Sequence, residues 1–196
     1  MDIVLATRNA KKIEELRRMM TGLQINILSL DDFDCHEVQE DADTFEGNAV
    51  KKAAAVSKCT GIAAISDDSG LEVDALGSLP GVYSARYAGE DASDERNVKK
   101  LISAMDKVPF EERGARFVCC IALVLADGSI RTFEGEVKGR IASAPKGSNG
   151  FGYDPVFYPE GHDITFAQMT PDQKDSMSHR NAALKKLKLC LQKNGS

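Results

Sequence analysis

The pattern of apolar and polar positions changes period several times along the chain, and each period predicts one kind of element. Short continuous apolar runs are typical of buried strands, whereas apolar residues three and four positions apart are typical of helices packed on one face. The first half of the chain alternates between these patterns. It predicts strands at 2–6, 25–30 and 62–66, and helices through about residue 21, over about 44–60, and from Ser93 to about Met105.

The second half predicts a hairpin followed by a glycine-rich loop and a helix. Two strand-like runs at 115–126 and 129–137 flank the turn dipeptide Asp127-Gly128. The loop 147–155 follows, and one last helix begins at Thr170 and continues through the leucines near the C-terminus. Alternating strands and helices together with a hairpin predict an α/β fold with a mixed sheet.

Length and composition are typical of one globular domain. The chain has 196 residues, 42% of them hydrophobic and 28% charged, with no repeat or flexible linker, so we expect a single domain over residues 1–196. No apolar run is long enough to span a membrane, which predicts a cytoplasmic protein. A net charge of −5 provides no basic surface for nucleic acid.

The five cysteines do not form a recognisable metal or disulfide pattern. None of them lies in a CxxC pair, and the neighbours Cys119 and Cys120 fall in a strand-like run that points them to opposite faces. We therefore expect buried free thiols and neither a zinc site nor a disulfide framework.

The turn 7–12 between the first strand and the first helix is unusually basic. Arg8, Lys11 and Lys12 lie at the positive end of the helix dipole, where acids would be favourable, and Asn9 is a suitable cap. A bound phosphate would account for this charge, because helix N-termini bind anions. The alternative is a basic turn exposed to solvent.

Lys52 lies on the apolar stripe of the second predicted helix, with Ala49 and Val56. Such a lysine either extends its ammonium group to the edge of the core or faces a buried anion. A helix followed by a strand normally packs against that strand, and this strand leads directly to Asp67 and Asp68. The two acids are therefore candidate partners for Lys52.

Acidic residues gather before the second helix and after the third strand. Mg²⁺ in proteins favours a few carboxylates together with waters and phosphate oxygens, so one acid of the first group and at least one of the second could hold it. The alternatives are a solvated loop with Asp43 as the helix cap, and a simple turn at 67–70. The acids are Glu37, Glu40, Asp41 and Asp43 in the first group and Asp67 and Asp68 in the second.

The loop 150–155 could present an aromatic ring to a nucleobase. Glycines flank Phe151, while Asp154, His179 and Arg180 could donate to or accept from a base edge. The alternative is a structural loop, with His179 on a helix surface.

Together these segments resemble the inosine/xanthosine triphosphate pyrophosphatases, enzymes that remove deaminated purine nucleotides. The resemblance covers nearly the whole chain through 5-LATRNAKK-12, 44-TFEGNAVKKA-53, 66-SDDSGLEVDALGSLPGVYSARYAGEDASD-94, 150-GFGYDPVF-157 and 178-SHR-180. It implies a two-lobed α/β fold with a long central mixed sheet flanked by helices, a cleft between the lobes, and a homodimer. It also implies Mg²⁺-dependent hydrolysis of ITP, dITP and XTP to the monophosphate and pyrophosphate.

The resemblance assigns a role to each matching residue. Asp68 and Lys52 are the expected catalytic residues, and Asp68 would orient or deprotonate the attacking water. The expected metal ligands are Glu40, Asp68 and, close by, Asp67. The expected phosphate-binding residues are Thr7, Arg8, Asn9, Ala10, Lys11, Lys12 and Ser69. The expected base- and sugar-binding residues are Phe151, Gly152, Tyr153, Asp154, Lys174, His179 and Arg180.

Three other functions are compatible with parts of this pattern. A pyrophosphatase with another base preference, such as modified pyrimidines, would share the chemistry and differ in the base pocket. A nucleotide-binding sensor without turnover does not require paired acids beside a lysine. A phosphomonoesterase is disfavoured, because no nucleophile motif is present.

Overall fold

A computed structural model describes residues 1–193 of the chain and contains five α-helices and six strands within them. None of these helices is long and apolar enough to cross a membrane. The strands are β1 (Asp2–Leu5), β2 (Asn26–Ser29), β3 (Ala63–Val73), β4 (Gly114–Val124), β5 (Ile130–Ile141) and β6 (Phe157–Pro159). The helices are α1 (Ala10–Met20), α2 (Phe45–Thr60), α3 (Asp94–Ala104), α4 (Pro171–Met177) and α5 (His179–Lys193).

The strands form one six-stranded mixed sheet in the order β2-β1-β3-β4-β5-β6, which confirms the predicted α/β fold. β1 pairs in parallel with β2 and β3, while β5 and β6 are antiparallel. The predicted hairpin is present, because β4 and β5 are neighbours joined by a tight turn at 125–129. The chain divides into two compact units: unit 1 is 1–68, 119–135 and 180–196, and unit 2 is 69–118 and 136–179.

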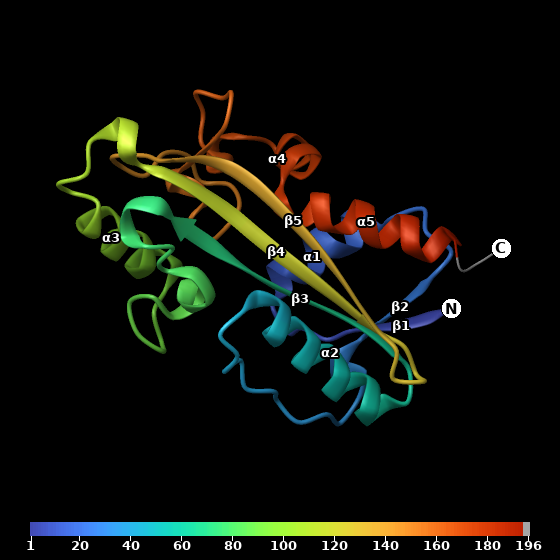
Figure 1. Cartoon of the computed structure of the whole chain (residues 1–196). Helices are drawn as coiled ribbons and strands as arrows, with labels where there is room; N and C mark the ends of the chain where they lie inside the picture. Colours follow the sequence, from blue (N-terminus) through green and yellow to red (C-terminus); the bar gives the residue numbers. More distant parts are fainter. Residues whose placement is uncertain (194–196) are drawn as a thin grey trace. The chain divides into compact units, whose positions relative to one another are not determined.

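Unit 1 has a core on each face of its strands. One core packs α1 and α5 against odd-numbered residues of β1 and β3, such as Ile3 and Ile65. The other packs α2 and Leu30 against even-numbered residues, such as Val4 and Ala64. Figure 1 shows the same division, with α2 on one side of β1 and with α1 and α5 on the other. The parity of a β3 residue therefore determines which helices its side chain meets.

Unit 2 has a single core beneath α3. Leu71 and Val73 of β3 pack with Phe117 of β4 and with Leu101 of α3. Phe117 contacts Phe157 edge to face, with ring centroids 4.7 Å apart. This core supports the loop 150–154, which the sequence assigned to the base.

Several predicted boundaries differ from those of the structure. The third strand does not end before Asp67 but runs through both acids to Val73, so the alternative of a simple turn at 67–70 is wrong. The last helix is interrupted at Ser178, whose extended backbone separates α4 from α5. The alternative cap Asp43 is also wrong: Thr44 caps α2 by accepting the Gly47 N–H at 3.0 Å.

The prediction of free thiols is wrong for two of the cysteines. Cys35, which precedes α2, and Cys59, in its last turn, form a disulfide with Cα atoms 6.0 Å apart. They are 24 positions apart, so the fold and not a local motif brings them together. Cys119 and Cys120 are buried free thiols as predicted, and Cys190 is also free.

Candidate active site

The basic turn after β1 is organised by its cap. The Asn9 side chain accepts hydrogen bonds from the backbone N–H groups of Lys11 and Lys12, at 3.1 and 3.2 Å, and so opens α1. Thr7 in turn accepts from the Asn9 N–H at 3.2 Å. Arg8 is half-exposed, donates to the Cys35 carbonyl and pairs with Asp31. The first turn of α1 contains no acid, so its basic charge is met by groups elsewhere.

Asp67 lies on the α1 and α5 face of β3, at the centre of a buried ion network. Its Oδ2 atom is 3.3 Å from the Lys12 ammonium and 3.0 Å from Nη2 of Arg180. Arg180 also pairs with Glu15 of α1 through its other terminal nitrogen. The remaining oxygen of Asp67, Oδ1, is buried and has no hydrogen-bond partner among the described residues.

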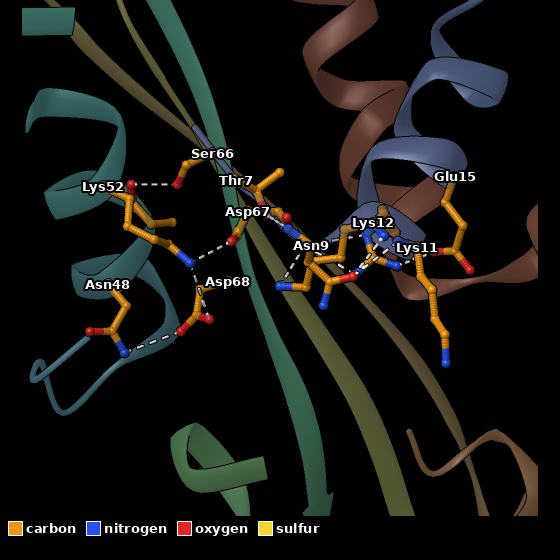
Figure 2. Close-up of polar contacts among 12 residues, drawn as sticks. Thr7, Asn9, Lys11, Lys12, Glu15, Asn48, Lys52, Ser66, Asp67 and Asp68 are labelled. Atoms are coloured by element: carbon orange, nitrogen blue, oxygen red, sulfur yellow. Dashed lines mark hydrogen bonds and ion pairs between the residues drawn. The ribbon is translucent and has the colours of Figure 1, made fainter. Parts of the chain in front are cut away.

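Asp68 points to the opposite face of β3, toward α2 (Figure 2). Asn48 donates to its Oδ2 atom at 3.1 Å, and the Lys52 ammonium is 3.6 Å from its Oδ1 atom. Asn48 and Lys52 are four positions apart and therefore share one helix face. Lys52 reaches Asp67 only through the backbone, donating to its carbonyl at 2.8 Å. The adjacent acids thus avoid one another by pointing to opposite faces.

The acidic segment before α2 contributes Glu40. Its carboxylate accepts from the Lys52 ammonium at 2.6 Å, so Lys52 lies between Glu40 and Asp68. Asp41 instead pairs with the exposed Lys51. The structure therefore places Glu40, and not Asp41, beside the buried lysine.

Burial and charge shift the pKa values of the two aspartates in opposite directions. Burial raises the pKa of Asp67, but the positive charges around it, above all Lys12 and Arg180, outweigh burial and hold its pKa well below the usual range. Burial also dominates at Asp68, where Lys52 offsets it only in part, so that its pKa is raised. Burial lowers the pKa of Lys52, yet the surrounding carboxylates outweigh it and raise the pKa, so the lysine stays charged.

The carboxylates are compatible with a Mg²⁺ ion that the substrate helps to bind. Among the described residues, no three His, Cys, Asp or Glu side chains form a metal site by themselves. Mg²⁺ does not require such a cage, because it retains waters and binds phosphate oxygens. Glu40 and Asp68 both contact Lys52, and Asp67 has one buried oxygen without a partner. Glu40 and Asp68, which share Lys52, fit the expected ion as a pair, whereas the Asp67 carboxylate points to the opposite face of β3 and does not join them.

In unit 2, Asp154 organises the glycine-rich loop. Its Oδ2 atom accepts from the Phe151 N–H at 2.9 Å and from the buried Lys174 ammonium at 2.6 Å. Gly150 is required here, because a Cβ atom at this position would lie 2.0 Å from the same oxygen. Lys174 also lies 4.8 Å from the centroid of the Phe151 ring. An aromatic ring, a cation and an anion thus contact one another in this loop.

The other residues assigned to the base are also held firmly. Gly152 donates its N–H to Asp94 at 2.8 Å, and the buried Tyr153 hydroxyl donates to the Ser84 carbonyl at 2.8 Å. His179 is buried and stacks on Phe117, with ring centroids 4.9 Å apart, so it is not a surface residue.

The two units thus divide the predicted residues. Thr7, Arg8, Asn9, Ala10, Lys11, Lys12, Glu40, Lys52, Asp67, Asp68 and Arg180 belong to unit 1, whereas Ser69, Phe151, Gly152, Tyr153, Asp154, Lys174 and His179 belong to unit 2. Their predicted roles in binding and catalysis stay predictions.

Sequence reasoning missed two residues of the unit 1 network. Glu15 could have been found, because it lies three positions after Lys12 and hence on the same side of α1. Asn48 could have been found in the same way from Lys52. The pairing of Arg180 with Asp67 had no local signal, since 113 positions separate them.

Comparison with known proteins identifies the family. The sequence model of the Ham1 family matches residues 3–190. The dITP/XTP pyrophosphatase of Geobacter sulfurreducens is 50% identical over 95% of this chain and 94% of its own, and that of Bacillus subtilis is 42% identical over 97% of each. The solved structure of a HAM1 protein from Coxiella burnetii has a TM-score of 0.91 at 38% identity, covering 98% of this chain and 99% of its own. This chain therefore belongs to the Ham1 family.

Proposed function

We propose that this protein is a nucleoside triphosphate pyrophosphatase that hydrolyses the non-standard purine nucleotides dITP, XTP and ITP and so removes deaminated purines from the nucleotide pool. The observation that carries the proposal is the buried pair of Asp68 and Lys52, in a chain 42–50% identical to dITP/XTP pyrophosphatases. A carboxylate with a raised pKa is suited to accept a proton, and a charged lysine beside it is suited to a phosphate.

Phosphoryl transfer depends on positioning and on offsetting negative charge, because its transition state is loose. Lys12 and Lys52 are the cations of the proposed phosphate site, together with the backbone and side chains of 7–12. Both ammonium groups are held next to aspartates that keep their positions fixed. Glu40 and Asp68 would hold Mg²⁺, which when bound would offset charge on the phosphate oxygens.

In the proposed step, water attacks the α-phosphorus. The water oxygen forms a bond to phosphorus, and the bond from the α-phosphorus to the bridging oxygen breaks. Pyrophosphate leaves with that electron pair, while the proton of the water passes to the Asp68 carboxylate and then to solvent. The products are one nucleoside monophosphate and one pyrophosphate, so no co-reactant besides water is required.

Selection for a 6-keto purine would come from donors in unit 2. Lys174 and backbone N–H groups of the loop 151–154 would pair with the keto oxygen, and adenine would leave these donors unpaired. The ring of Phe151 would stack on the base, with Asp154 and His179 holding the loop and its surroundings. Because Arg180 donates to Asp67 and Glu15, its influence on selectivity would be indirect.

Product analysis tests the proposal. The protein is incubated with Mg²⁺ and, separately, with ITP, dITP, XTP, ATP or GTP, and the phosphate products are separated. We expect pyrophosphate and monophosphate, formed much faster from ITP, dITP and XTP. Orthophosphate as the product, or equal rates with ATP, would contradict the proposal. Binding without turnover would instead favour a nucleotide sensor.

A cytoplasmic homodimer belongs to the same proposal, through the family resemblance. Sedimentation of the full chain at several concentrations would test the dimer. A monomer at every concentration would contradict this part and leave the chemistry unaffected.

A further inference from the structure

Asn48 is a buried amide in the first turn of α2 that connects two parts of unit 1. Its side chain is 1% exposed. Its Oδ1 atom accepts the Ala42 N–H at 2.9 Å, and its Nδ2 atom donates to the Ala42 carbonyl at 3.3 Å and to Oδ2 of Asp68 at 3.1 Å. One amide therefore links the backbone of the acidic segment to a carboxylate of β3.

These partners fix the orientation of the amide. Only the Oδ1 atom can accept the Ala42 N–H, so the Nδ2 atom must face Asp68. Both hydrogens on Nδ2 are then used, one for each acceptor. An aspartate at position 48 could still accept the Ala42 N–H, but it could not donate to Asp68.

Asn48 also completes a closed ring of contacts that includes the buried Lys52. Asn48 holds Oδ2 of Asp68, and Lys52, one helical turn later, faces Oδ1 of the same carboxylate at 3.6 Å. Lys52 also binds Glu40, two positions before Ala42. Since each oxygen of Asp68 faces a different α2 side chain, the carboxylate is held in one orientation.

We propose that Asn48 is a positioning residue for the hydrolysis, which donates to Oδ2 so that the Asp68 carboxylate is oriented to accept the proton of the attacking water. This inference rests on the proposed function. It assigns the donor character of Asn48, and not its size, to catalysis. Asn48 itself does not touch the reacting atoms.

Three variants separate donation from packing. Asn48→Asp keeps the shape of the side chain and its acceptor for Ala42, but replaces the donor by a negative charge. Asn48→Ala removes both functions. Ser57→Ala is the matched control, because Ser57 is a buried polar residue of α2 that donates to the Leu125 carbonyl at 3.3 Å and has no contact with Asp68.

We expect kcat for ITP to fall about 10- to 100-fold in Asn48→Ala and in Asn48→Asp, as for other groups that orient a reacting residue. In Asn48→Ala, the Kd for α,β-methylene-ITP should stay within about threefold of wild type, since the loss lies in the chemical step. Ser57→Ala should retain wild-type kcat, even where its melting temperature falls as far as that of Asn48→Ala.

Three outcomes would overturn the inference. The first is Asn48→Asp with a kcat within about twofold of wild type, because the donor would then be dispensable. The second is an equal loss of kcat in Ser57→Ala and Asn48→Ala, which would mean a structural role. The third is wild-type protein without turnover, in which case the proposed function fails as well. If wild type and the Asn48 variants are all active, this inference alone is overturned.

Discussion

The two units each contain an arginine that bridges two carboxylates, in opposite surroundings. In unit 2, Arg116 joins Glu72 and Glu136, at 2.7 and 3.1 Å, and its side chain is 46% exposed. In unit 1, Arg180 joins Glu15 and Asp67, and its side chain is 1% exposed. The ion pairs have the same chemistry and similar geometry. Their exposure to solvent is very different.

The distance between two charges therefore does not determine how much their ion pair contributes to stability. Water screens the exposed pairs of Arg116 with Glu72 and Glu136 and can replace either partner, so such pairs contribute about 0–1 kcal/mol to stability. The Arg180 side chain is shielded from solvent, so removing one partner leaves a buried, uncompensated charge. Exclusion of solvent also raises the pKa of Asp68, whereas the cations Lys12 and Arg180 hold the pKa of Asp67 low against the effect of burial.

The largest effect is expected for Asp68→Asn. Loss of the carboxylate removes the proposed proton acceptor, and we expect kcat for ITP to fall about 10²- to 10⁴-fold. The fold should be retained or slightly stabilised, because a buried charge with a raised pKa is neutralised. Steady-state kinetics with thermal melting measures both. A variant that is active at near wild-type rates would contradict the role of Asp68.

Arg180→Met is expected to destabilise the protein by about 3–5 kcal/mol, because it leaves Glu15 and Asp67 buried without their shared cation. Urea unfolding monitored by circular dichroism gives this free energy. A loss below about 1 kcal/mol would show that buried and exposed bridges are equivalent here, contrary to the comparison.

Loss of the Cys35–Cys59 disulfide is expected to cost about 3 kcal/mol, since the bond closes a loop that contains the acidic segment and α2. Cys35→Ser and Cys59→Ser should unfold at lower urea concentration than wild type, and a dithiol reductant should destabilise wild type and Cys190→Ser but not these two variants. Cys190→Ser, at a free cysteine, is the control. Equal stability of all four proteins would contradict this disulfide.

Acid should weaken unit 1 through Asp67. Its pKa in the folded protein lies below the unfolded value of about 4, so its contribution is present above that pH and is lost as the pH falls toward the folded value. Urea unfolding of wild type from pH 7 down to pH 3 should therefore show decreasing stability at the acid end, in approximate terms below pH 4. Arg180→Met, which lacks one source of the depressed pKa, should lose less on acidification. An equal loss would contradict the role of this network.

The smallest effect is expected for Arg116→Met, which removes the exposed pairs with Glu72 and Glu136. The loss should be at most about 1 kcal/mol and should shrink further in high salt. Urea unfolding at low and high salt measures it. A loss comparable with that of Arg180→Met would contradict the screening by solvent.

Much of the fold could be predicted, because local periodicity and caps determine it. The predicted helix over about 44–60 is α2, opened by Thr44 and closed by Gly61 with a left-handed backbone. The third strand was predicted too short, because Asp, Ser and Gly favour turns. In the structure β3 lies next to β1 and β4, and this tertiary pairing overrides the local preference.

The candidate site could be predicted only where its partners are close in sequence. Lys52 and Asp68 were matched because a helix packs on the strand that follows it. The pairing of Arg180 with Glu15 spans 165 positions, and only the packing of α1 and α5 on one sheet face creates it. The Cys35–Cys59 bond was missed for the same reason.

The position at which water attacks the triphosphate can be tested directly by following the oxygen of that water. Wild-type protein is given dITP and Mg²⁺ in isotopically labelled water, and the label is located by mass spectrometry. If Asp68 directs water to the α-phosphorus, the label appears in the monophosphate and not in pyrophosphate. Label in pyrophosphate, or release of orthophosphate, would place the attack at another phosphorus and contradict the proposed reaction.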